Sequence, residues 1–164
     1  MLTRCEVTMS RRAPRKTTLD PEESLKHLLE ECRMVLPGIQ ALFGFQLIAV
    51  FNKPFWDLLG VPQRLAHLAA ICLMALAIGL VLAPASYHRL AEPDAVTQRY
   101  LRTSSRFITF GMAALMGGML VDIFLIAQLL LPQMAYAVIL TAAMALFFTG
   151  LWYLFPLARA RQGG

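Results

Sequence analysis

The sequence predicts an all-α fold class: a polytopic membrane protein with a bundle of four transmembrane helices and an N-terminal cytoplasmic amphipathic helix. Three observations support this prediction. Hydrophobic residues make up 58% of the 164 residues and charged residues 15%, whereas a soluble domain has about a quarter charged residues. Four apolar runs are long enough to cross a bilayer. Basic residues gather before the first run, between the second and third runs and after the fourth, which is one side of the membrane in a polytopic protein.

Residues 1–18 are polar, and their five basic residues are Arg4, Arg11, Arg12, Arg15 and Lys16. Too few apolar side chains are present to offset the entropy of ordering, so we expect a disordered basic tail. The segment lacks the continuous apolar stretch of a secretory signal peptide, and we therefore expect no cleavage.

Residues 19–33 are predicted to form an amphipathic juxtamembrane helix. Asp20 is a capping residue, and Pro21 suits the first helical turn. Spacings of three and four make one apolar stripe of Leu25, Leu28, Leu29, Cys32 and Leu36. Because the opposite face is acidic, we expect the stripe to pack against this protein or a partner rather than adhere to anionic lipid.

The transmembrane domain is predicted at 34–158, followed by a cytoplasmic tail at 159–164. Its four spans lie at about 34–51, 65–86, 107–131 and 133–158. A run of 18 residues reaches about 27 Å in a helix, close to the thickness of the hydrocarbon layer. Since lipid offers no hydrogen-bond partners, such continuous runs cross as helices.

Basic residues outside the spans predict the orientation. Thirteen lie before the first span, between the second and third spans, or after the fourth. Only Lys53 and Arg64 lie on the opposite side. The positive-inside rule therefore places both termini and the middle loop in the cytoplasm.

Small residues spaced by four mark the helix faces that we expect to turn inward. These stripes are Ala75, Gly79 and Ala83 on the second span, Ala114, Gly118 and Asp122 on the third, and Ala137, Thr141, Ala145 and Thr149 on the fourth. Ordinary helix packing accounts for such stripes more often than a cavity between them does.

Asp122 is the strongest candidate for a functional group. An ionised carboxylate inside a membrane costs several kcal/mol, so it should be protonated, paired or open to a water-filled cavity. Gln46 lies at a comparable depth and His67 nearer the outer surface, and we expect these two as partners. A structural, protonated carboxyl bonded to Gln46 is the alternative, because a single acid without a basic partner is an incomplete ion-coupling site.

A second candidate cluster lies at the predicted cytoplasmic interface and comprises Gln40, Pro84, Tyr87, His88 and Arg106. Pro84 cannot donate to the carbonyl of Leu80, which leaves an acceptor for a cation, water or a side chain. The alternative, which we favour, is that proline shapes the helix end while the other side chains anchor it among the headgroups.

The sequence contains no catalytic, metal-binding or cofactor motif. The three histidines and three cysteines, which are His27, His67, His88, Cys5, Cys32 and Cys72, have no HxxxH or CxxC spacing. We therefore predict no enzymatic activity, no cofactor and no metal site. The net charge of +5 lies at the edges of apolar runs, so we predict no nucleic-acid partner.

Four stretches resemble a family of small bacterial membrane proteins of unknown function: 36–45 (LPGIQALFGF), 54–55 (PF), 63–64 (QR) and 83–90 (APASYHRL). The likeness covers about 25–131, and Ala-Pro-x-x-Tyr-His-Arg is its most specific part. The resemblance implies a multi-span protein of the bacterial inner membrane and assigns no activity. Asp122 matches no motif of that family.

Two functions are compatible with the sequence. The first is an accessory or structural protein that binds a partner through its acidic-faced amphipathic helix, and base rates favour it. The second is a small oligomeric proton- or cation-linked channel or transporter that uses Asp122, since four short helices enclose little volume. The expected partners are the lipid bilayer and either a second copy or another membrane protein.

Overall fold

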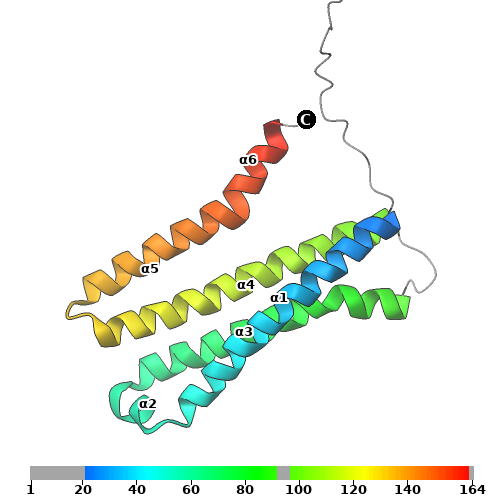
Figure 1. Ribbon diagram of the computed structural model, residues 1–164. Helices are drawn as coiled ribbons and strands as arrows, with labels where there is room; N and C mark the ends of the chain where they lie inside the picture. Colours follow the sequence, from blue (N-terminus) through cyan, green and yellow to red (C-terminus); the bar gives the residue numbers. More distant parts are fainter. Residues whose placement is uncertain (1–20, 92–96, 163–164) are drawn as a thin grey trace, which may run out of the picture.

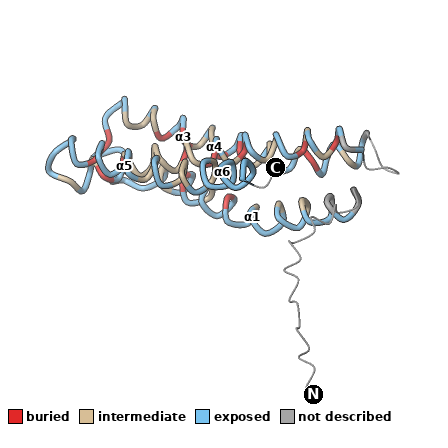
Figure 2. Tube along the Cα trace, turned by 90° about the horizontal axis from the view of Figure 1, so that it is seen from above, coloured by how far each residue is buried: buried red, intermediate tan, exposed pale blue. Residues whose placement is uncertain are grey.

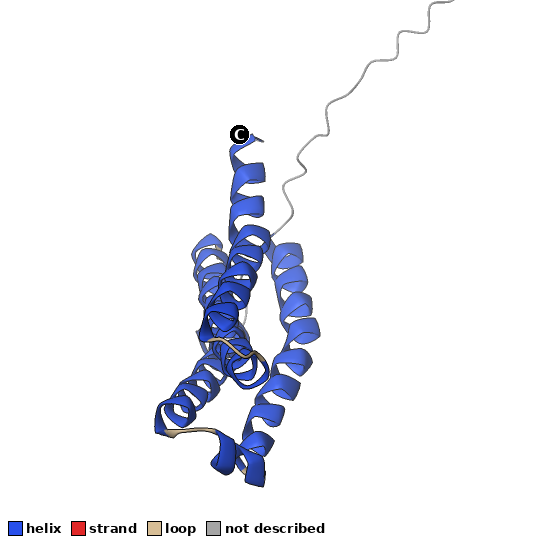
Figure 3. Ribbon diagram, turned by 90° about the vertical axis from the view of Figure 1, so that its left-hand side faces the viewer, coloured by secondary structure: helices blue, strands red, loops and turns tan. Residues whose placement is uncertain are grey.

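The computed structural model describes residues 21–91 and 97–162, and this part of the chain consists of helices joined by short turns (Figures 1 and 3). Four helices are long and apolar enough to cross a membrane: Lys26–Val50, Val61–Leu90, Arg99–Leu130 and Met134–Gln162. The predicted all-α fold with four long apolar helices is confirmed. The predicted tail at residues 1–18 lies outside the described residues.

The span predicted at 65–86 lies within one of these helices, and those predicted at 34–51, 107–131 and 133–158 each extend one residue beyond theirs. The elements are α1 (Pro21–Val50), α2 (Lys53–Leu58), α3 (Val61–Ala91), α4 (Gln98–Leu130), α5 (Met134–Thr149), the π-helical turn η1 (Gly150–Leu154) and α6 (Phe155–Gln162). The last three form one continuous bent helix (Figure 1). The described part of the segment predicted as a tail, 159–162, therefore continues α6.

The predicted juxtamembrane helix and the first span form a single helix, α1. Its described residues start at Pro21, and it continues through Pro37 without a boundary at residue 33. The described part of the apolar stripe is half-buried, and its Cys32 and Leu36 pack against the core. The stripe thus packs against this protein, because the helix continues straight into the bundle.

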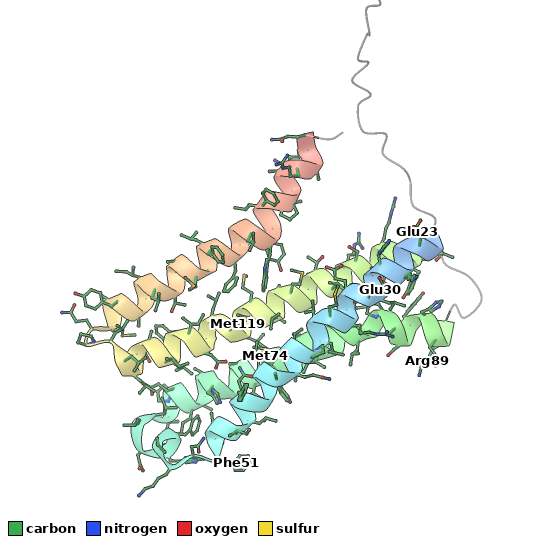
Figure 4. All side chains as sticks on the ribbon, viewed as in Figure 1. Glu23, Glu30, Phe51, Met74, Arg89 and Met119 are labelled. Atoms are coloured by element: carbon green, nitrogen blue, oxygen red, sulfur yellow. The ribbon has the colours of Figure 1, made fainter. Side chains whose placement is uncertain are left out.

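The long helices run in alternating directions, so the connections lie at two ends of the bundle. The start of α1, the ends of α3 and α6 and the start of α4 lie at one end, which we call the basic end (Figures 1 and 4). Its described basic residues are Lys26, Arg33, Arg89, Arg99, Arg102, Arg106, Arg159 and Arg161. The opposite end, which we call the α2 end, holds α2 and the turn between α4 and α5, with Lys53 and Arg64.

α3 and α4 pack most closely, and small residues at heptad spacing make this approach possible. Ala70 and Ala77 on α3 face Gly118 and Gly111 on α4. A Cβ atom on Gly118 would lie 3.2 Å from the Ala70 carbonyl oxygen, and one on Gly111 would lie 3.4 Å from that of Ala77. Small side chains at a seven-residue repeat let two helix backbones approach. We call these four residues the α3–α4 seam.

The predicted inward stripe of α3 is wrong. Ala75 and Gly79 are exposed, and a Cβ atom on Gly79 would meet no heavy atom within 4 Å. The inward face instead carries Ala70, Met74 and Ala77. Small residues occupy two faces of α3, and the face that matches the glycine spacing of α4 is the one that packs.

The stripes predicted for the third and fourth spans do face the bundle. Ala114 and Gly118 of α4 are buried. On α5, Ala137 is buried and Thr149 Oγ1 lies 4.0 Å from Met116 Sδ on α4. The π-helical turn that follows allows the consecutive Trp152 and Tyr153 both to turn partly inward.

The apolar core lies between the middle of the bundle and the basic end. It comprises Ile39, Met74, Ala77, Val81, Ala114 and Leu115, with Trp152 packed against it. Buried residues gather along α3 and α4, whereas α1 and α5 are mostly exposed (Figure 2). This core separates two polar groups that lie at opposite ends of α3 and α4.

Candidate functional site

The structure brings Asp122 together with both residues predicted as its partners. Gln46 Nε2 donates to Asp122 Oδ2 at 2.5 Å. His67 Nδ1 lies 3.4 Å from Asp122 Oδ1, and His67 Nε2 lies 3.0 Å from the Gln46 carbonyl oxygen. We call these residues the polar triad. It joins α1, α3 and α4 near the α2 end.

The α3–α4 seam explains why these groups meet. Asp122 follows Gly118 by one helical turn, and His67 precedes Ala70 by nearly one turn. The close backbone approach at Gly118 therefore brings the two side chains together, and α1 crosses beside them to add Gln46. Gln46 and His67 are 5% and 7% exposed, whereas the Asp122 side chain is 24% exposed. Asp122 is thus the most accessible member of the triad.

The hydrogen-bond partners indicate which tautomer of His67 fits the polar triad. A carbonyl oxygen only accepts, so His67 Nε2 carries a hydrogen toward Gln46. The contact of Nδ1 with Asp122 Oδ1, at 3.4 Å, is favourable when one more proton lies on the imidazole or on the carboxyl. Without it, a nitrogen lone pair would face a carboxylate. Both arrangements are neutral overall, which reconciles the acid with its apolar surroundings.

A cavity of about 470 Å³ adjoins the polar triad. Its ten apolar lining residues are Leu42, Phe45, Ala49, Pro54, Phe55, Leu58, Leu59, Leu125, Ile126 and Leu129. The four polar ones are Gln46, Asn52, His67 and Asp122. A mostly apolar cavity with a few polar groups has the usual composition of a small-molecule site.

The short helix α2 covers the His67 side of the triad. Phe55 packs edge-on against the His67 ring, with 5.2 Å between the ring centroids. Arg64 holds α2 in place by donating to the carbonyls of Trp56 and Leu59 at 2.6 and 2.8 Å. Its guanidinium also lies 4.8 Å from the centre of the Trp56 ring, within cation–π distance.

The polar triad has an unfilled acceptor. Within the described part of the chain, Gln46 Oε1 is buried and has no hydrogen-bond donor. Each side-chain nitrogen of the triad, by contrast, already faces an oxygen acceptor. The buried atom of the triad that lacks any described partner is therefore an oxygen that needs a donor.

The second predicted cluster forms only in part, around a tyrosine that the sequence analysis missed. Tyr100 is 1% exposed, and its hydroxyl donates to the Pro84 carbonyl at 2.9 Å. Its ring stacks on Tyr87 at 5.5 Å and lies 5.8 Å from the His88 ring. We call these four residues the tyrosine group, which lies at the basic end of α3 and α4.

Two predicted members of that cluster do not join it. Gln40 and Arg106 are exposed, and no described hydrogen bond or ring contact links them to the tyrosine group. The tyrosine hydroxyl uses the carbonyl of Pro84 itself, rather than that of Leu80, which was the predicted acceptor. Tyr100 was missed because it precedes the charge-free run that marked the third span, although it lies one turn before the buried Ser104.

Among residues 21–91 and 97–162, no group of three or more histidine, cysteine, aspartate or glutamate side chains is placed to hold a metal ion. The candidate chemistry of the described chain is therefore that of the polar triad. This triad places an imidazole and a carboxyl in contact beside a mostly apolar cavity.

Comparison with curated proteins and with solved structures finds no match. One protein-family model, described as "Family of unknown function (DUF6328)", matches residues 19–156. The match extends from just before α1 to the beginning of α6 and includes the polar triad, the cavity and the tyrosine group. The chain therefore belongs to this family of unknown function.

Proposed function

We propose that this chain is an integral, multi-pass protein of a bacterial inner membrane with both termini in the cytoplasm. The four long apolar helices support insertion. The concentration of basic residues at the basic end supports the orientation, since positively charged loops stay in the cytoplasm. The resemblance of the 83–90 stretch to a bacterial family supports the choice of membrane. The polar triad then lies in the outer half of the bilayer.

We further propose that the chain is a small proton-linked permeation unit whose working groups are Asp122 and His67. The observation that carries this proposal is the contact of His67 Nδ1 with Asp122 Oδ1. An acid without a basic partner is an incomplete site for coupling to ions, and His67 supplies that partner. The proposal assigns the chain no enzymatic activity, no cofactor and no nucleic-acid partner.

The accessory or partner-binding role is the second candidate, and the structure of α1 weakens its main argument. That role depended on a free apolar stripe, whereas Cys32 and Leu36 of the stripe pack into the chain's own core. What favours a structural role is that the polar triad ties three helices together through its own hydrogen bonds.

The apolar core bears on how permeation would work. No described polar group of the core connects the polar triad with the tyrosine group, since the residues between them are apolar. A path through one rigid chain is therefore unfavourable. We propose that the unit is oligomeric, with further polar contacts supplied between copies.

Proton flux into liposomes that contain the purified chain tests this function. We compare the parent with Asp122→Asn, and use Asp57→Asn as the matched control because Asp57 is an exposed carboxylate of α2. We expect flux in the parent and in the control, and its loss in Asp122→Asn. Absence of flux from the parent overturns the proposal. If Asp122→Asn then also has lower thermal stability, the triad is structural.

A further inference from the structure

We propose that the cavity beside the polar triad binds a hydrophobic organic cation with N–H donors, and that this cation replaces the proton held between His67 and Asp122. The inference rests on the proposed function, because it names the class of solute that a proton-linked site would carry. It follows from three properties of the site: the walls, the unfilled acceptors and the neutral charge.

The walls favour an organic molecule over a hydrated metal ion. Ten of the fourteen lining residues are apolar, and about 470 Å³ is large enough for a small organic body. Hard metal cations take about six or more oxygen ligands, often including waters. The four polar lining residues cannot provide such a shell, whereas side chains such as Leu42, Phe45 and Ile126 can cover an alkyl or aryl group.

The polar groups of the site favour a ligand whose polar end carries a hydrogen-bond donor. Gln46 Oε1 lacks a donor, and the Asp122 carboxyl is accessible from the cavity. An N–H group can reach Asp122 directly, and it can reach Gln46 Oε1 once the amide turns toward the cavity. A ligand that only accepts, such as an ether or a quinone, leaves Gln46 Oε1 without a donor. An anion would be repelled by the Asp122 carboxylate.

The charge of the site favours a one-for-one exchange. The polar triad is neutral while it holds its shared proton, and a net charge in apolar surroundings is costly. When a monovalent cation enters, neutrality returns if the proton leaves His67 Nδ1 for solvent. Nε2 keeps its hydrogen on the Gln46 carbonyl, and the bound ammonium donates one N–H to the Asp122 carboxylate and another to the freed Nδ1, so that these two acceptors do not face each other without a hydrogen. One cation therefore enters for each proton released.

The other described charged groups near the α2 end do not line the cavity and are not expected to take part in the exchange. Lys53 and Asp57 on α2 are exposed. Arg64 on α3 is bound to the carbonyls of Trp56 and Leu59. No charged side chain of the described α1 contacts the triad, to which α1 contributes Gln46. Asp122 and His67 are thus the described titratable groups that line the cavity.

Four probes with the same tail separate charge from hydrogen-bond donation: octylammonium, octyltrimethylammonium, 1-octanol and octanoate. We titrate each into the purified full chain in detergent and follow the heat in two buffers of different ionisation enthalpy, which gives the protons released. At pH 7 the primary amine is charged, as a lysine side chain is. We expect octylammonium to bind at least about tenfold more tightly than the other three, because only it makes charge-assisted N–H bonds.

The parent should release about one proton per octylammonium bound, and Asp122→Asn should lose at least about tenfold in affinity for octylammonium only. Asp57→Asn should bind like the parent. Equal binding of octylammonium and 1-octanol by the parent, or binding without proton release, overturns the inference. If Asp122→Asn does not fold, Ile126→Trp replaces it, because a larger side chain fills the cavity beside the triad. This variant should weaken octylammonium and 1-octanol together, and unchanged binding overturns the site.

The two proposals fail in different ways. If liposomes show proton flux but the chain does not bind octylammonium, the organic-cation site is rejected and the proton-linked permeation unit is retained. If octylammonium binds with proton release in detergent but liposomes show no flux, the permeation function is rejected and the cation site is retained.

Discussion

The polar triad and the tyrosine group lie at opposite ends of the same helix pair, yet they solve the burial of polar atoms differently. At the basic end, a neutral hydroxyl donates to the Pro84 carbonyl, and two rings cover it. Near the α2 end, an acid and an imidazole meet beside an open cavity. The hydroxyl of the first arrangement has its acceptor, although His88 Nδ1 beside it is buried without a partner in the described chain, whereas the second arrangement brings two ionisable groups together.

This difference separates a hydrogen bond that fixes two helices from a pair of ionisable groups beside a cavity. A tyrosine hydroxyl on a backbone carbonyl has one stable arrangement, so it fixes the ends of α3 and α4 relative to each other. The triad has two neutral arrangements of its shared proton and one acceptor without a donor. Between the two, the α3–α4 seam keeps the helix pair together, so that changes at one end need not disturb the other.

The largest effect is expected from breaking the seam that both ends share. Gly118→Leu would place a Cβ atom 3.2 Å from the Ala70 carbonyl oxygen, with further atoms beyond it. We expect a loss of about 3 kcal/mol or more in the free energy of unfolding, since overpacking forces the backbones apart. Denaturant-induced unfolding in detergent micelles measures it.

Gly79→Leu is the matched control, because a Cβ atom there would meet no heavy atom within 4 Å. If both leucine variants lose the same stability, the close approach of α3 and α4 is not what stabilises the bundle. The α3–α4 seam would then not be the structure that holds the polar triad and the tyrosine group in place.

The second largest effect is expected at the polar triad. Asp122→Ala leaves Gln46 Nε2 and His67 Nδ1 without their acceptor, and an unsatisfied buried polar group costs about 1–3 kcal/mol. We expect a loss of about 2 kcal/mol in unfolding free energy, and a smaller loss in Asp122→Asn, whose amide oxygen still accepts from Gln46. Equal unfolding free energies for the parent and Asp122→Ala would contradict the triad's hydrogen bonds.

A smaller effect is expected at the tyrosine group. Tyr100→Phe removes the hydroxyl bond to Pro84 while it keeps the ring that packs on Tyr87. We expect a loss of about 1 kcal/mol in unfolding free energy and unchanged proton flux in liposomes. A loss of flux without a loss of stability would show that the basic end, too, takes part in permeation.

The sequence predicts the partners of Asp122 well because membrane depth is a strong constraint. Gln46 and His67 could be selected by counting residues from the ends of charge-free runs, and the structure places both on Asp122. The inward face of α3 was harder to predict. Ala75 and Gly79 are as small as Ala70 and Ala77, and only the position of the glycines on α4 decides between the two faces.

The cavity and the tyrosine group depend on contacts that no single segment encodes. The stripe on α1 is visible in the sequence, but whether it packs on its own chain depends on where the helix leads. Phe55 lies between the first two predicted spans, and its contact with His67 depends on how α2 folds back over the triad. Tyr100 lies outside the apolar run, so hydropathy gave no reason to bury it.

The smallest effect is expected from loosening α2, and it sharpens the comparison because only one end has such a cover. Arg64→Gln removes two hydrogen bonds to the carbonyls of Trp56 and Leu59 and the contact with the Trp56 ring. These groups lie near the surface, so we expect the unfolding free energy to fall by less than about 1 kcal/mol. Amide hydrogen exchange should nevertheless become faster over Lys53–Leu58 and stay unchanged around Tyr100, because local opening follows local contacts. If exchange stays slow at α2, then Phe55 on His67 is enough to hold the cover, and access to the cavity must instead come from movement of α1.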